Sequence, residues 1–179
     1  EEARAAGIHK YENHLIPGLL QTPDYVQAVL RCAVPSLEED EIEAAVTARL
    51  ARQQVFHRRP RPHVTFVLER VLLARPLGGR TVLKTNLEHL LMVGQLPNVE
   101  IQVMLEDRET HAGVDGPFVL LETAKRERQL VYVEGQGGRY FLSEQPEVGE
   151  VFARYGTLRA QALSPEDSAR LIEQVAREL

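Results

Sequence analysis

Apolar residues recur along the chain with two different periods, which separate extended segments from helical ones. Short β-rich runs predict five strands, at His63 to Glu69, Val99 to Leu105, Phe118 to Glu122, Leu130 to Glu134 and Arg139 to Leu142. Between the first two runs, leucines at helical spacing predict a helix from about Arg80 to Gln95. A strand, a helix and a strand in succession form a crossover unit, so we expect at least one parallel pair of strands.

Helical patterns precede and follow these strands. We expect helices at Glu1 to His14, Thr22 to Ala33 and Ser36 to His57, the first of them starting without an N-cap, as a longer helix cut open would. Ser36 and Glu39 have the spacing of a capping box for the third helix. Two amphipathic helices close the chain, and Ser164 caps the second of them.

Together these elements predict one globular domain of the α/β (α+β) class. A helical segment at 1–62 packs on a small mixed sheet at 63–142, and the C-terminal helices occupy 143–179. Glycines between 135 and 138 link the last two strands as a hairpin. A chain of 179 residues buries enough surface for one substantial core without a metal or a disulfide.

Composition and charge narrow the class of protein. The chain has 21 basic and 26 acidic residues, a formal net charge of −5, and this balance weighs against binding nucleic acid through this chain alone. Its apolar runs are too short for a membrane-spanning helix, and its N-terminus lacks the pattern of a secretory signal. The single cysteine, Cys32, lies in an apolar stretch and is expected to be a buried thiol, which fits a cytoplasmic location.

The chain carries none of the common short motifs for catalysis or nucleotide binding. Its histidines invite a metal site, but His9 and His14 are five apart on a predicted helix and so face different directions. His57 and His63 stand on either side of a proline-rich break, without a cysteine or acidic companion at ligand spacing. We therefore expect no metal site, no cofactor and no catalytic residue.

The loop at 106–116 is the best candidate for a polar site. It follows the carboxyl end of a strand in the crossover unit, where α/β sheets tend to bind ligands. It offers acidic, basic and hydrogen-bonding side chains, namely Asp107, Arg108 and His111. Gly113 and Gly116 would allow unusual backbone angles. With Glu122 or Glu134 this loop would suit a hydrolase, whereas a solvated charged loop is the simpler interpretation.

A basic segment without acidic residues lies between positions 49 and 61. Its arginines are Arg49, Arg52, Arg58, Arg59 and Arg61. Such a cluster would suit direct contact with the phosphate groups of a nucleic acid. The lack of interleaved aromatic residues and the negative net charge favour instead a solvated helix end that pairs with acidic residues elsewhere.

A resemblance to a known family rests on the run from Tyr11 to Tyr25, with the sequence YENHLIPGLLQTPDY. This run resembles the start of the C-terminal domain of unknown function (DUF5753-type) of actinobacterial Xre-family helix-turn-helix regulators, which are sometimes described as antitoxin-like. The resemblance continues in order through Arg49 to Gln53, His111 to Gly113, Val131 to Glu134 and Ala162 to Glu166, so it spans nearly all of the chain.

The resemblance implies a regulatory domain whose DNA-binding helix-turn-helix domain lies N-terminal to it and is absent from this chain. DNA would then be contacted only through that domain. Members of the family are commonly encoded beside small partner proteins, so we expect this domain to bind such a partner or a small-molecule effector. The family supplies no catalytic residues. Because helix-turn-helix proteins usually read paired half-sites, we also expect a homodimer.

A weaker similarity concerns the fold. The order of strand, helix, strand, glycine-bearing loop and strand pair resembles half of a phospholipase D-like domain. The chain lacks the H-x-K-x4-D motif of that family. Any such relation would therefore be one of structure and not of activity.

The most specific part of the resemblance, Pro17 to Thr22, has two interpretations. As architecture, the proline and glycine fix a turn, the two leucines anchor it in the core, and the glutamine and threonine bond backbone groups at the start of the next helix. Alternatively, the run contacts a ligand. The candidate residues for binding a ligand or partner are therefore Pro17, Gly18, Leu19, Leu20, Gln21, Thr22, Arg49, Arg52, Asp107, Arg108, His111 and Glu134.

Overall fold

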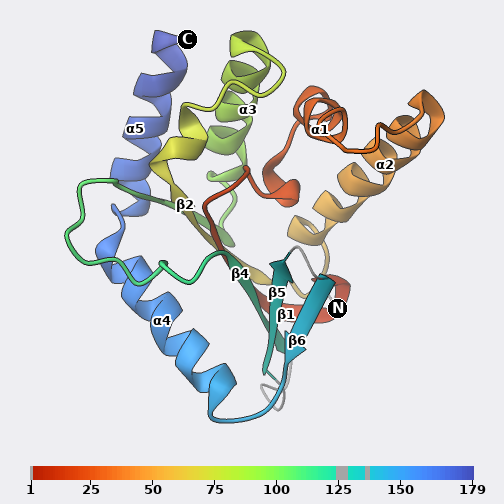
Figure 1. Cartoon of the computed structure of the whole chain (residues 1–179). Coiled ribbons are helices and arrows are strands. Elements are labelled where there is room, and N and C mark those ends of the chain that lie inside the picture. Colours follow the sequence, from red (N-terminus) through yellow and green to blue (C-terminus); the bar gives the residue numbers. More distant parts are fainter. Residues whose placement is uncertain (1, 124–128, 136–137) are drawn as a thin grey trace.

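Six strands form one mixed sheet in the order β3-β2-β1-β4-β5-β6, with helices on both faces (Figure 1). The computed structural model describes residues 2–123, 129–135 and 138–179. Its strands are β1 (Ala5–Glu12), β2 (His63–Glu69), β3 (Val99–Met104), β4 (Phe118–Thr123), β5 (Gln129–Gly135) and β6 (Gly138–Leu142). Its α-helices are α1 (Pro23–Leu30), α2 (Glu39–Arg52), α3 (Arg80–Val93), α4 (Glu147–Gln161) and α5 (Pro165–Glu178). Short 3-10 helices are η1 (Glu2–Arg4), η2 (Gly18–Leu20), η3 (Gln53–Phe56) and η4 (Arg70–Leu73).

The sheet joins a parallel half to an antiparallel half. β1, β2 and β3 are parallel, and α3 connects β2 to β3 as the predicted crossover. β4 pairs antiparallel with β1, and β5 and β6 continue the antiparallel pairing. The mixed α/β class and the parallel pair predicted from the sequence are confirmed. β5 and β6 pair as the predicted hairpin, whose turn at 136–137 lies outside the described residues.

The predicted helix over Glu1 to His14 is wrong, because most of this segment forms β1, a central strand of the sheet. β1 pairs with β2 on one side and with β4 on the other. Ile8 packs into the core on one face of the sheet and Tyr11 into the core on the opposite face. The glutamates and alanines at the start favour a helix in isolation, but pairing with two neighbouring strands outweighs that local preference.

Two hydrophobic clusters fill the two faces of the sheet. The first includes Phe66 and lies against Leu87 of α3 and Ile172 of α5. The second includes Val67 and lies against Leu158 of α4. Figure 1 shows α3 and α5 beside each other and α4 apart from them. Because α5 packs on β3, these two helices cover the parallel half of their face.

Local capping explains where the helices begin. Thr22 and Ser164 cap α1 and α5 as predicted, since each side chain accepts a hydrogen bond from the backbone three residues later. The capping box of α2 is not at Ser36. Glu38 and Glu41 form it instead, with the Glu38 backbone N–H donating to the Glu41 carboxylate at 2.9 Å. A carboxylate is thus placed at the positive end of α2.

Cys32 is exposed, so the predicted buried thiol is wrong. The residue follows the end of α1, where the chain turns away from the core. Its Sγ lies 3.3 Å from the carbonyl oxygen of Ala28 in the preceding turn. Among residues 2–123, 129–135 and 138–179, no helix is long and apolar enough to cross a membrane.

Candidate functional site

The run from Leu15 to Thr22, hereafter the wall, follows β1 and is hydrogen-bonded to α2 and α3. η2 forms its centre, and Leu19 and Leu20 are buried in the core, as the architectural interpretation predicts. Gln21 is also buried and connects the wall to α2. Its Nε2 donates to the carbonyl of Ile16 at 2.6 Å, and its Oε1 accepts from Arg49 at 3.1 Å.

Asn86 of α3 holds the other end of the wall. Its side chain is fully buried, and its Oδ1 accepts a hydrogen bond from the Thr22 backbone N–H at 2.7 Å. Its Nδ2 donates to the carbonyl of Leu20 at 3.1 Å. The sequence interpretation missed this residue. The signal was available, because Asn86 falls on the apolar stripe of Leu83, Leu87 and Leu90, where a polar side chain needs buried partners.

A groove of about 710 Å³ lies between this wall, α2 and the antiparallel half of the sheet. Small-molecule sites usually have volumes of about 300–1,000 Å³. The groove is lined by Glu2, Lys10, Glu12, Leu15, Ile16, Pro17, Gly18, Gln21, Val29, Arg49, Arg52, Val119, Leu121, Tyr132 and Phe141. The structure therefore brings together five of the predicted site residues, namely Pro17, Gly18, Gln21, Arg49 and Arg52.

The lining of the groove on the sheet side is apolar and aromatic. Val119 and Leu121 of β4 contribute to it, together with Tyr132 of β5 and Phe141 of β6. The rings of Tyr132 and Phe141 lie side by side on paired positions of the two strands, with centroids 5.2 Å apart and planes tilted by 53°. Phe141 is 56% exposed, so a large part of its ring is open to solvent. The groove thus presents an aromatic surface to solvent.

Charged side chains also line the groove, and two ion pairs lie among them. Lys10 Nζ lies 3.2 Å from the carboxylate of Glu12. Arg52 contacts both carboxylate oxygens of Glu2, with Nη2 2.8 and 2.9 Å from them. Arg52 was predicted to pair with a distant acid, and Glu2 is that partner.

A second polar cluster lies where β1 and β2 end. Tyr11 Oη donates to the carboxylate of Glu69 at 3.0 Å, and His111 Nε2 lies 2.8 Å from the same oxygen. The Gly113 backbone N–H donates to His111 Nδ1 at 2.9 Å. Since Nδ1 accepts, the proton must be on Nε2, which donates to Glu69. Burial and the nearby Glu69 charge raise the pKa of the Tyr11 phenol, so this group also stays a donor.

His111 Nε2 therefore holds the loop at 106–116 to Glu69 at the end of β2, while Nδ1 accepts a hydrogen bond from within the loop. Gly113 is not among the glycines with positive φ, contrary to the prediction. A glycine is needed at this position because the side chains of Tyr11 and His111 come close to its Cα. A Cβ at this position would collide with the ring end of Tyr11 and would lie 2.7 Å from Cε1 of His111. Gly116 has a φ of 98°, as predicted for this glycine.

A family model decides where the chain belongs. The model of a domain of unknown function, DUF5753, matches residues 1–174. The chain belongs to the DUF5753 family. Comparisons with curated proteins and with solved structures found no match. The similarity to half of a phospholipase D-like domain and the link to Xre-family regulators therefore stay predictions.

The remaining predicted residues of the DUF5753 domain do not converge on one site. Asp107 and Arg108 are exposed on their loop. Glu122 lies beside His9, with the two side chains 3.7 Å apart, and it does not join His111. Glu134 is opposite Arg139 in the register of β5 and β6, and its side chain lies outside the described part of the chain. In the described ranges, no group of three or more His, Cys, Asp and Glu side chains could hold a metal ion.

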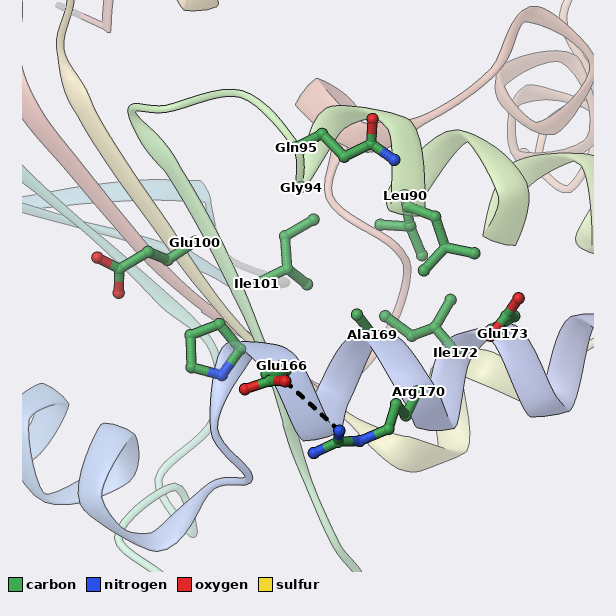
Figure 2. Close-up of a pocket in the computed structure, with 12 residues that line it drawn as sticks. Leu90, Gly94, Gln95, Glu100, Ile101, Glu166, Ala169, Arg170, Ile172 and Glu173 are labelled. Carbon is green, nitrogen blue, oxygen red and sulfur yellow. Dashed lines mark hydrogen bonds and ion pairs between the residues drawn. The ribbon is translucent and has the colours of Figure 1, made fainter.

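The DUF5753 domain has a second cavity, of about 410 Å³, between α3, β3 and α5. Figure 2 shows that the side chains of Leu90, Ile101 and Ile172 line it between the two helices. Glu166 and Arg170 pair with each other across one turn of α5 at the edge of this cavity. None of the predicted site residues lines it. The larger groove is therefore the better candidate for a binding site.

His9 of the DUF5753 domain lies on the α4 face of the sheet. Its Nδ1 is 2.7 Å from the hydroxyl of Thr65, which is 2.8 Å from the hydroxyl of Tyr155. Burial lowers the pKa of His9, and Glu122 opposes this effect. Electrostatic interactions with His63 and with Arg159 also lower the pKa of His9. The neutral form of His9 is therefore the one that the folded state favours.

Acidification is expected to destabilise the DUF5753 domain through His9. Because the pKa of His9 is lower in the folded state than the ordinary value of about 6.5, the unfolded chain takes up this proton first as the pH falls. The stabilisation is complete above about pH 6.5 and is lost between that pH and the folded pKa. Urea unfolding between pH 7.5 and 5.5 gives the slope of the free energy of unfolding against pH. His9→Asn should make this slope shallower, and an unchanged slope would contradict the role of His9.

Proposed function

We propose that this domain is a non-enzymatic regulatory domain that binds a small effector in the groove. The observation that carries the proposal is the groove itself, whose wall is the P-G-L-L-Q-T-P run, the most family-specific part of the sequence. Arg49 and Arg52 of α2, from another shared motif, line the same groove. The groove combines apolar and aromatic side chains with a few convergent charged groups, and ligand sites usually use such groups to fix the orientation of the ligand.

The contacts of the alternative sites favour this choice over an enzyme or a nucleic-acid interface. A general base needs a free nitrogen or oxygen within reach of substrate, and both ring nitrogens of His111 have partners within the chain. Within the arginine cluster at 49–61, Arg49 and Arg52 line the groove itself. The net charge of −5 also opposes binding to phosphate groups.

In the proposed regulator, effector binding would be reported to a helix-turn-helix domain N-terminal to this one, and DNA would be contacted only there. Such a signal requires the effector to bind two conformations or two oligomeric states with different affinities. We include a homodimer in the proposal, because helix-turn-helix regulators usually bind paired half-sites. A small partner protein is the alternative ligand, and it would act through the same requirement.

Effector binding is expected to raise the melting temperature of the purified domain. A metabolite extract is fractionated, and fractions that raise Tm are analysed by native mass spectrometry for a bound small molecule. A ligand at about 100 times its Kd adds about 2.7 kcal/mol, a rise of about 5–10 °C for a domain of this size. Phe141→Asp should remove the shift without unfolding the domain, since Phe141 is exposed on an edge strand.

Val114→Asp is the matched control, because Val114 is an exposed apolar residue remote from the groove. This variant should bind as the parent chain does. A shift that persists in Phe141→Asp would place the ligand elsewhere. The proposal would be contradicted if the domain bound only a protein and Phe141→Asp left that binding unchanged.

A further inference from the structure

The groove contains a carboxylate that is already bound to an arginine. The guanidinium of Arg52 holds Glu2 through two nitrogens, with Nη2 2.8 and 2.9 Å from the carboxylate oxygens and Nε 3.1 Å from one of them. Both side chains line the groove. This forked geometry is the one in which arginine binds carboxylate ligands. Glu2 therefore lies where the anionic group of a ligand would bind.

The contact between Glu2 and Arg52 is easily exchanged. The side chain of Arg52 is 51% exposed and that of Glu2 is 28% exposed. Ion pairs that are open to solvent contribute little to stability, because water solvates the separated charges almost as well. Moving Glu2 away therefore costs little. A ligand anion on Arg52 would restore the same hydrogen bonds.

The surroundings of the pair favour a ligand over Glu2. Among the described residues, Lys10, Arg49 and Arg52 line the groove with Glu2 and Glu12, and Lys10 is paired with Glu12 at 3.2 Å. Departure of Glu2 takes this carboxylate away from Arg52, and a ligand anion neutralises the charge of Arg52 again. The rings of Tyr132 and Phe141 offer apolar surface that the short side chain of Glu2 has no group to cover. An aromatic body attached to the anion would bury this surface.

We infer that the groove binds a small aromatic anion, such as an aromatic carboxylate, whose charged group replaces Glu2 on Arg52. This inference rests on the proposed function and names the ligand class of the same groove. The volume of about 710 Å³ fits a small molecule. Glu2 belongs to η1, which leads directly into β1. Exchange therefore shifts this end of the chain toward its released state when the groove is occupied, which makes occupancy a conformational signal.

Two fluorescent probes with the same ring system test the exchange on the full chain. One is 8-anilinonaphthalene-1-sulfonate, which is an anion, and the other is N-phenyl-1-naphthylamine, which lacks the sulfonate. Glu2→Gln should lower the Kd of the anionic probe about twofold to fivefold, because its competitor is gone. Arg52→Gln should raise that Kd about tenfold or more, because a charged hydrogen-bond donor is lost. Neither change should alter the Kd of the neutral probe.

Two further variants locate the probes. Phe141→Ser should raise the Kd of both probes, since the rings of both probes would pack on the aromatic surface of Tyr132 and Phe141. Glu173→Gln is the matched control, because it removes the acid of an exposed pair, Glu173 with Arg177 at 2.6 Å, beside the second cavity. It should change neither Kd. Far-UV circular dichroism and thermal unfolding check that each variant is folded.

The outcomes separate this inference from the proposed function. Equal affinity of the anionic probe for the parent chain and Glu2→Gln would overturn the exchange, and so would an equal gain in Glu173→Gln. If Phe141→Ser still weakens both probes in that case, the groove remains a ligand site. If Phe141→Ser changes neither Kd, the probes bind elsewhere, and both the ligand class and the groove are overturned.

Discussion

Replacing Asn86 with alanine is expected to lower the free energy of unfolding by about 2–4 kcal/mol. The side chain is fully buried and bonds two backbone groups, the N–H of Thr22 and the carbonyl of Leu20. Alanine would leave both groups buried without a partner, at about 1–3 kcal/mol each. Urea unfolding followed by circular dichroism gives the change. Ligand binding in the groove should weaken as well, because the wall at 15–22 would no longer be fixed to α3.

Thr85→Ala is the control for this experiment, because Thr85 is exposed on the same helix. Its effect should stay within about 0.5 kcal/mol. A loss below about 0.5 kcal/mol in Asn86→Ala would show that water or another group forms hydrogen bonds with the Thr22 N–H and the Leu20 carbonyl in its place. In that case the wall would not depend on α3.

Replacing Gly113 with alanine is expected to lower the free energy of unfolding by about 3 kcal/mol. The added Cβ would collide with the ring end of Tyr11, which is buried and bonded to Glu69. Overpacking of this kind costs about 1–3 kcal/mol and sometimes more, since a buried ring cannot move away. The same collision would separate His111 from Glu69. Thermal unfolding would report the loss, and proton NMR would report the change at His111.

Gly156→Ala provides a control of opposite sign. Gly156 lies in α4, and a Cβ there would meet no atom within 4 Å. Alanine should therefore stabilise the helix by about 0.5–1 kcal/mol. If Gly113→Ala were as stable as the parent chain, the loop at 106–116 would not lie against Tyr11 as described.

The strands after residue 62 could be predicted from the sequence, whereas the first strand could not. Each later strand is a short apolar run between turn residues, which is a local signal. β1 mixes helix-favouring residues at its start with polar His9 and Lys10 in its middle. Its extended form depends on β2 and β4, whose pairing is a property of the whole fold.

The candidate site was predicted in part for a similar reason. Gln21, Arg49 and Arg52 stood in motifs of the family and do line one groove. Tyr132 stood in a family motif and Phe141 in a predicted strand, but neither position gave a signal of exposure, since exposure depends on which helices cover the sheet. His111 was noticed, but its partners Tyr11 and Glu69 are far away in sequence and near it only in space. Pairings between distant segments leave no pattern that a single sequence reveals.

The central place of β1 also determines how mechanical load enters the domain. A pull on the backbone before Ala5 acts on a strand that is hydrogen-bonded along both edges. Many such bonds would have to break together, so the sheet resists the force as one rigid unit. Any segment attached ahead of Ala5 would then move with the sheet. Rotation of that segment relative to the sheet would be confined to η1, where the Glu2–Arg52 ion pair lies.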